Sequence, residues 1–214
     1  MVGRVYTVAQ QKGGAGKTTL AAHLAVAWHE AGLRVAVIDI DPQGSLTRWY
    51  QTRTEALNGH TGISHLQING WRTQREVERL ARDNDIVVID SPPHAETEAR
   101  IAVRVANLVI VPVQPSPMDM WATQPTLDLA REEKVPALLV INRVPPRAKL
   151  ADDLIERIKT MGSNSGATVA QTHVGNRIQF AAALFEGRSV TESAKRTRAA
   201  EEIQELATEI LNRG

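Results

Sequence analysis

Five short runs that are apolar at consecutive positions constrain the fold of this chain more than any other feature of its sequence. A strand that alternates apolar and polar residues has one exposed face, whereas a continuously apolar strand is buried on both faces, as in a parallel sheet covered by helices. Helical patterns follow or separate these runs. This alternation predicts an α/β fold with a doubly wound, mostly parallel sheet and helices on both faces, whose ligands lie at the carboxyl ends of the strands. The predicted strands are Val5–Ala9, Val35–Ile40, Ile86–Asp90, Leu108–Val113 and Ala137–Ile141, and the predicted helices are Lys17–Ala31, Gln74–Asp83, Thr97–Ala106, Ala122–Glu133, Ala151–Met161 and Ala199–Leu211.

Two polar stretches, Gln51–Gly70 and Ser163–Gly166, are predicted to be irregular connections because they lack apolar periodicity. The terminal helix has one apolar face, and we expect its glutamates to point away from that face. The chain has 214 residues, of which 43% are hydrophobic, so we expect one well-buried domain over residues 1–214. The four glutamates are Glu201, Glu202, Glu205 and Glu209.

Composition excludes several classes of protein. The chain has no cysteine, which excludes disulfides, iron–sulfur clusters, thiolate zinc sites and cysteine nucleophiles. Its longest apolar runs are far shorter than the roughly 20 residues of a membrane-spanning helix, and no signal segment opens the chain, so we expect a cytoplasmic protein without a membrane partner. The formal net charge is only +1, so any binding to nucleic acid must come from a local patch.

A glycine-rich segment, Gln10–Thr19, joins the first predicted strand to the first predicted helix. Glycines let backbone N–H groups converge on phosphate oxygens, and the helix N-terminus adds positive potential. Lys17 is placed to neutralise the β- and γ-phosphates, and the Thr18 hydroxyl to ligate Mg²⁺. The strict G-x-x-x-x-G-K-[ST] pattern fails because Gln11 occupies its first glycine position, and the alternative is a glycine-rich turn with incidental lysines. The predicted phosphate-binding residues are Gly13, Gly14, Ala15, Gly16, Lys17, Thr18 and Thr19.

Two carboxylate segments follow predicted strands. Asp41 lies just past the strand Val35–Ile40, where its side chain can reach a γ-phosphate or the attacking water, although Asp41-Pro42 is also a common turn initiator. Asp90 ends a run of four apolar residues, which is the Walker B form, whose aspartate holds Mg²⁺ through water. His94 follows soon after, and we interpret it as a loop residue and not as a general base.

These three segments, in this order, resemble the ParA/MinD family of P-loop ATPases, with the deviant Walker A loop K-G-G-x-G-K-T-T. The resemblance continues almost to the C-terminus. Residues 111–119, Val-Pro-Val-Gln-Pro-Ser-Pro-Met-Asp, are similar to the proline-rich segment of short, ParF-like plasmid-partition ParA proteins. Ile141-Asn142-Arg143 occupies the place where the family contacts adenine, and Gly187-Arg188-Ser189-Val190 before the terminal helix also fits.

The resemblance implies a set of site residues for ATP and Mg²⁺. Lys12 resembles the signature lysine, which crosses to the nucleotide of a partner subunit, so hydrolysis depends on dimerisation. Asp41 resembles the residue that orients the attacking water, and Asp39 its partner in that motif. The catalytic set is Lys12, Lys17 and Asp41. The Mg²⁺ set is Thr18, Asp39 and Asp90. The adenine-side set is Asn142, Arg143, Pro115 and Met118, and Trp121 with Met118 is a second candidate for the adenine or the dimer contact.

Within the family, the sequence favours a short ParA protein. Branches that ligate iron–sulfur clusters need cysteine. MinD-like membrane binding needs basic residues beside the apolar face of a terminal helix, whereas this helix is acidic. The phosphate loop starts by residue 12, which leaves no room for an N-terminal helix-turn-helix domain. The implied function is an ATPase that binds DNA without sequence preference as an ATP-bound homodimer, is found on the nucleoid, and is stimulated by a ParB-like adaptor to position a plasmid, chromosome or other cargo.

The candidate DNA surface is the segment from His173 to Arg198, which holds more basic than acidic residues. Such a local excess binds phosphates, and a dimer doubles it; the alternative is that these are ordinary solvated cations. Two other functions stay open: a MinD-like membrane-associated regulator, and a metabolic P-loop ligase or kinase of the dethiobiotin synthetase type. The candidate DNA contacts are Arg177, Arg188, Lys195, Arg196 and Arg198.

Overall fold

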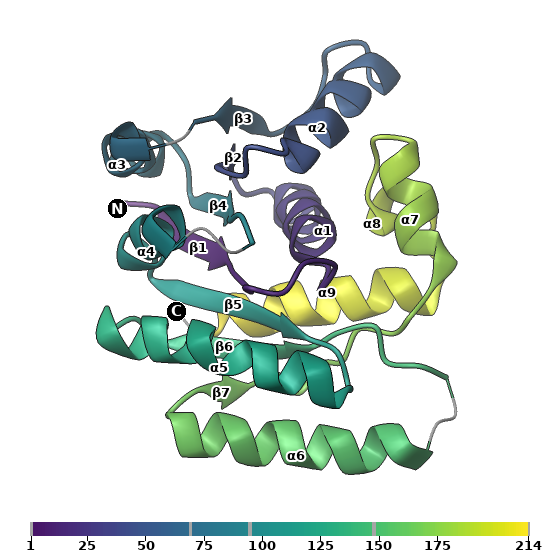
Figure 1. Ribbon diagram of the computed structural model, residues 1–214. Coiled ribbons are helices and arrows are strands. Elements are labelled where there is room, and N and C mark those ends of the chain that lie inside the picture. Colours follow the sequence, from purple (N-terminus) through teal and green to yellow (C-terminus); the bar gives the residue numbers. More distant parts are fainter. Residues whose placement is uncertain (1, 69, 94–95, 147–148, 214) are drawn as a thin grey trace.

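A seven-stranded sheet runs through the centre of the computed structural model, which describes residues 2–68, 70–93, 96–146 and 149–213 (Figure 1). Each neighbouring pair of strands is parallel. The predicted doubly wound α/β class is confirmed. In sheet order, the strands are β3 (Ser64–Gln67), β2 (Val35–Asp39), β4 (Ile86–Asp90), β1 (Arg4–Val8), β5 (Leu108–Val113), β6 (Ala137–Ile141) and β7 (Thr168–Val169).

Helices cover both faces of this sheet. One layer consists of α1 (Lys17–Glu30), α2 (Ser45–Ala56), α7 (Ile178–Phe185), α8 (Val190–Ser193) and α9 (Arg198–Leu211), and the other of α3 (Thr73–Asp83), α4 (Glu96–Arg104), α5 (Pro117–Glu132) and α6 (Lys149–Ser165). A short 3₁₀ turn, η1 (Gly70–Arg72), precedes α3. None of the helices in the described ranges is both long and apolar enough to cross a bilayer.

The continuous apolar runs are explained by this sandwich of layers. In β4, Ile86 and Val88 pack with the α1 and α9 layer, whereas Val87 and Ile89 pack with α3 and α4. All four are buried, because successive side chains of a strand point to opposite faces and both faces are covered. The central strands therefore lie in a core on each side of the sheet.

Parallel pairing brings the functional carboxylates to one edge of the sheet. Asp39 at the end of β2 lies opposite Asp90 at the end of β4, and Asp90 lies opposite Val8 at the end of β1. The glycine-rich loop leaves the same end of β1. The sheet thus places the phosphate loop and both aspartates side by side, although they are far apart in the sequence.

Two predicted irregular stretches are partly regular in the structure. Within Gln51–Gly70, α2 continues to Ala56 and β3 pairs with β2, and within Ser163–Gly166, α6 continues to Ser165 before Gly166 turns with φ +72°. The ends of α2 and α6 and the edge strand β3 are rich in polar residues, which is why their sequence does not show the apolar pattern of a helix or strand. His94 lies outside the described residues.

The terminal helix α9 begins one residue before its predicted start and packs its apolar face against α1. We predict that all four glutamates of this helix point away from its apolar face, and this prediction is wrong for two of them. Glu202 is buried and forms an ion pair with Arg177, and Glu209 accepts hydrogen bonds from the backbone N–H groups of Gln171 and Thr172. These two acids anchor the chain segment that leads into α7.

Candidate active site

The glycine-rich loop opens onto a cavity of about 1070 Å³. Gly16 caps the N-terminus of α1 with φ 93°, a conformation that side chains other than glycine rarely adopt. A Cβ atom added at Gly13 or Gly14 would meet no other atom within 4 Å, so the loop leaves open space in front of its backbone. This open cradle at a helix N-terminus fits an anionic group.

Lys17 and Thr18 line this cavity, and the buried Asp90 lies behind them. Lys17 is buried, and burial lowers the pKa of its ammonium against the opposing charges of Asp90 and Asp41. The Thr18 hydroxyl donates to Asp90 Oδ2 at 2.6 Å. Burial raises the pKa of Asp90 to about 7, helped by Asp39 and Asp41 and opposed by Thr18 and Lys17. A cationic lysine and a buried carboxylate therefore meet where phosphate and metal would bind.

The loop after β2 holds Asp41 at the cavity wall. Its backbone N–H donates to Asp39 Oδ1 at 3.0 Å, and its own Oδ1 accepts from Gln43 N–H at 2.9 Å. Asp39 Oδ2 accepts from both the N–H and the hydroxyl of Thr47, each at 2.8 Å. These three donors make Asp39 an anchor of the Asp41 loop, and its role as a Mg²⁺ ligand stays a prediction.

Lys12 extends to the other side of the loop. Its ammonium pairs with Asp119 Oδ2 of α5 at 2.5 Å, and the Ser116 hydroxyl donates to the same oxygen. Asp119 is 2% exposed, so this is a partly buried ion pair within one protomer. Lys17 is among the described residues that line the cavity, whereas Lys12 is not.

The predicted adenine-side residues divide into two groups. Asn142 and Arg143, which follow β6, line the cavity, and the Asn142 amide donates to the backbone oxygen of Ala15 at 2.8 Å. Pro115 and Met118 are not among the described residues that line the cavity, and their contact with the base stays a prediction. Met118 is instead 62% exposed at the start of α5, and Trp121 is 71% exposed nearby.

Three of the five candidate DNA contacts lie within ion-pair distance of acidic side chains, although their segment holds more basic than acidic residues. Arg177 pairs with the buried Glu202, and Arg198 lies within ion-pair distance of Glu201, Glu202 and Glu205. Lys195 is 3.9 Å from Glu30. The guanidinium groups of Arg188 and Arg196 form no hydrogen bond or ion pair within the described residues. The four acids of α9 lie outside the counted segment. Glu201, Glu202 and Glu205 reach Arg198 within their own helix, whereas the fold brings Glu202 to Arg177.

Three comparisons with known proteins agree with this geometry. The family model described as "CobQ/CobB/MinD/ParA nucleotide binding domain" matches residues 6–190. The chain belongs to this family. It is 29% identical to the maintenance of carboxysome distribution protein A of Halothiobacillus neapolitanus, over 95% of this chain and 94% of that protein. It is also 26% identical to the chromosome-partitioning ATPase Soj of Thermus thermophilus, over 98% and 96% of the two chains. A Cyanothece McdA variant in complex with ATP has the same fold, with a TM-score of 0.81, 16% identity, and 98% and 96% coverage.

As a ParA/MinD-type protein, the chain is an ATPase that uses ATP and Mg²⁺. The residues present fit both. Asp90 Oδ1 is buried and has no hydrogen-bond partner among the described residues, directly beside the Thr18 hydroxyl. Within those residues no cluster of three or more acidic or histidine side chains could hold a metal alone. Mg²⁺ at this ParA/MinD site would therefore take most of its ligands from phosphate oxygens and water.

Several residues of this ParA/MinD site escaped the sequence analysis. Asp119 was read only as the end of a proline-rich segment, yet Ser116 and Asp119 have the three-residue spacing of a helix N-cap, which the structure contains. Gln114 donates to the backbone oxygen of Gly14 at 3.1 Å. No sequence pattern predicts the role of Thr47, because its contact with Asp39 depends on how α2 packs back onto β2.

Proposed function

We propose that this ATPase forms a homodimer around ATP, binds DNA without sequence preference in that state, and positions a cargo through hydrolysis stimulated by a ParB-like adaptor. The observation that carries the proposal is the placement of Lys12. Lys12 is a second lysine on the phosphate loop that does not line the cavity lined by Lys17 and pairs with Asp119 instead. Once it leaves Asp119, it can reach the nucleotide of a second copy.

The proposed chemistry is positioning and charge stabilisation. Lys17 binds the β- and γ-phosphate oxygens, while Thr18 and Asp90 hold Mg²⁺, which neutralises phosphate charge. The Asp41 carboxylate accepts a hydrogen bond from the attacking water. Lys12 of the second protomer supplies the remaining positive charge, so that hydrolysis waits for dimerisation.

The proposed DNA surface is the turn region around α8. Arg188, Lys195 and Arg196 are the best candidates for phosphate contacts, because Glu202 already engages Arg177 and Arg198. Two copies of this small patch would raise affinity and steepen its dependence on salt. We propose a cytoplasmic, nucleoid-associated protein of a single domain, similar over 95% of its length to a carboxysome distribution protein and over 98% to Soj.

The alternative of a MinD-like membrane regulator has less support. The apolar face of α9, which would have to enter the lipid, is buried against α1 and the sheet. A metabolic ligase or kinase would need turnover that rises with a small substrate, and not with DNA and an adaptor.

The decisive experiment combines size-exclusion chromatography with gel shifts of arbitrary duplex DNA at low salt. With Mg²⁺ and a non-hydrolysable ATP analogue, we expect a dimer that retains DNA, and with ADP a monomer that does not. The Lys17→Ala variant should lose both properties. The Lys12→Ala variant should bind the analogue but hydrolyse ATP at the background rate.

The exposed ion pair Arg34–Asp85 offers a control far from the loop, because Arg34→Ala removes a surface cation without touching the site. It should behave like the unchanged protein. A chain that stays monomeric with the ATP analogue, or hydrolyses ATP faster with a metabolite than with DNA, would contradict the proposal.

A further inference from the structure

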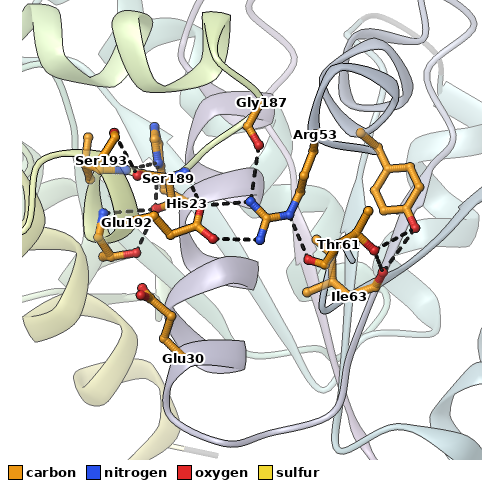
Figure 2. Close-up of polar contacts among 12 residues, drawn as sticks. His23, Glu30, Arg53, Thr61, Ile63, Gly187, Ser189, Glu192 and Ser193 are labelled. Carbon is orange, nitrogen blue, oxygen red and sulfur yellow. Dashed lines mark hydrogen bonds and ion pairs between the residues drawn. The ribbon is translucent and has the colours of Figure 1, made fainter. Parts of the chain in front are cut away.

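Arg53 is an almost fully buried arginine at the C-terminal end of α2, within a stretch whose sequence predicted a loop. Its guanidinium is held by three partners, as Figure 2 shows. It donates to the backbone oxygen of Thr61 at 2.9 Å and to that of Gly187 at 3.2 Å. It also forms a bidentate pair with the Glu192 carboxylate, with both distances at 2.8 Å.

Glu192 is itself fixed. Its Oε2 accepts the backbone N–H of Ser189 at 2.9 Å, completing a capping box for α8. Burial opposes ionisation of Glu192, but the hydrogen bonds from Arg53 and Ser189 outweigh burial and lower its pKa. Arg53 and Glu192 therefore join α2 to the corner between α7 and α8 through two charged groups in one geometry.

The corner also touches α2 through its backbone. A Cβ atom added at Gly187 would lie 2.4 Å from Arg53 N and 2.6 Å from Arg53 Cα. Backbones this close leave no room for α2 to slide. The C-terminal end of α2 is thus clamped by hydrogen bonds, charge and steric contact.

The opposite end of α2 carries the Asp41 loop. Thr47, in the first turn of α2, donates twice to Asp39 Oδ2, and Asp39 Oδ1 accepts the backbone N–H of Asp41. Thr47 and Arg53 are six residues apart, about 9 Å along a helix. A helix is stiff over this length, so the clamp at one end fixes the loop at the other.

A buried ion pair contributes little net stability compared with apolar residues of similar volume, because desolvation of two charges offsets their attraction. Its directional bonds, by contrast, define one orientation. We propose that Arg53, with Glu192, is a positioning residue for ATP hydrolysis: it sets the tilt of α2 and thereby places the Asp41 carboxylate for the attacking water. This inference rests on the proposed role of Asp41.

The test uses the double variant Arg53→Met/Glu192→Gln in the full-length protein. Met fills the volume of the arginine stem, and Gln can keep the capping box, so no uncompensated charge is buried. Steady-state ATP hydrolysis over a range of ATP concentrations, with saturating Mg²⁺, gives kcat and KM separately. We expect kcat to fall about tenfold with KM unchanged, because a misplaced group affects the transition state more than nucleotide binding.

A double-mutant cycle with Asp41→Ala separates positioning from loss of structure. If the clamp acts through Asp41, the clamp variant should lower kcat no further in the Asp41→Ala background. A further tenfold loss of kcat in the Asp41→Ala background, or an unchanged kcat of the clamp variant in the wild-type background, overturns this inference but not the proposed role of Asp41. An Asp41→Ala variant with normal kcat overturns the role of Asp41 and the inference with it.

Val77→Ala in α3 is the matched control, since it truncates a buried side chain on the other face of the sheet. Urea unfolding of each variant shows whether the stabilities match. The control should lose stability and keep its kcat. If kcat of this control also fell tenfold, lost stability would explain the effect of the clamp variant, and the inference would be overturned.

Discussion

Lys12 and Asp119 have unequal surroundings within their ion pair, with 35% of the lysine side chain exposed and 3% of the aspartate side chain. A nearly buried carboxylate is costly unless donors or a cation compensate it. Ser116 supplies a hydroxyl, and Lys12 supplies the charge. If Lys12 serves a second protomer, as proposed, it must first leave Asp119, so breaking this pair is part of the free-energy cost of dimerisation.

At the residue scale, we therefore expect Lys12→Ala to lower the free energy of unfolding of the nucleotide-free protein by about 1–3 kcal/mol, because it leaves the buried Asp119 carboxylate without its cation. The double variant Lys12→Ala/Asp119→Asn should recover part of that loss. Urea unfolding measures both. Equal stability of Lys12→Ala and the unchanged protein would show that the pair contributes nothing in solution.

His23 in α1 supplies a second residue-scale prediction. Its ring is buried, and Nδ1 accepts from the N–H of Val190 at 3.2 Å and lies 3.1 Å from the Ser189 hydroxyl. Because Thr191 donates twice to that hydroxyl oxygen, we assign its proton to the bond with Nδ1, and the ring proton to Nε2. Burial lowers the pKa of His23 to about 4, against weaker opposing effects of Phe180 and Glu192.

The sign of the pH effect follows from this lowered pKa. Between about pH 6.5 and 4 the unfolded chain binds a proton at His23 that the folded chain does not, so stability falls on acidification through this window. We expect His23→Asn, whose side-chain oxygen can replace Nδ1 as acceptor, to remove part of this acid sensitivity. Urea unfolding at pH 7 and pH 5 checks it. An unchanged difference between the two pH values would contradict the assignment.

At the scale of elements, the parts predicted well from the sequence were those with local chemistry. The phosphate loop, the central strands and Asp90 carry glycine, apolar or carboxylate patterns that depend on a few neighbouring residues. The end of α2 and β3 were missed because an exposed helix face and an edge strand are both polar. Glu202 was misplaced because its burial depends on Arg177, 25 residues away in the chain.

Gly187 allows an element-scale prediction about the contact between α2 and the corner of α7 and α8. Gly187→Ala should lower the free energy of unfolding by about 1–3 kcal/mol, because the added methyl group meets the Arg53 backbone and φ is +66°. Gly32→Ala is the control: it has φ +88° but no atom within 4 Å of its Cβ, so it suffers the backbone strain alone. Equal losses of stability in both variants would mean that the corner between α7 and α8 shifts to accommodate the methyl group at no cost.

At the scale of the whole molecule, exposed apolar side chains indicate where a second copy is expected to pack. Trp121 and Met118 are exposed at the start of α5, next to the Lys12–Asp119 pair. The sequence predicts either an adenine or a dimer contact for them. Neither lines the cavity formed by the described residues, and we propose the dimer contact. Sequence alone could not decide, because helix α5 and the cavity meet only in the folded chain.

We expect Trp121→Gln to weaken the dimer formed with an ATP analogue by about tenfold, since large aromatic side chains dominate interfaces. Its effect on monomer stability should be small, because the side chain is already exposed. Val2→Gln, at a similarly exposed apolar position before β1 (74% exposed against 71%), is the comparison variant. Sedimentation across a range of protein concentrations measures both, and equal weakening would point to general stickiness and not to a specific contact.

The sheet ends in two very short strands, the two-residue β7 and the four-residue β3 with its exposed Ser64 and Gln67. Long apolar sheet edges invite strands of other molecules to add to them. If the protein binds DNA as proposed, many copies lie close together along one DNA molecule and meet constantly. Blunt, polar margins of this kind would let many copies gather there without fusing edge to edge into fibres.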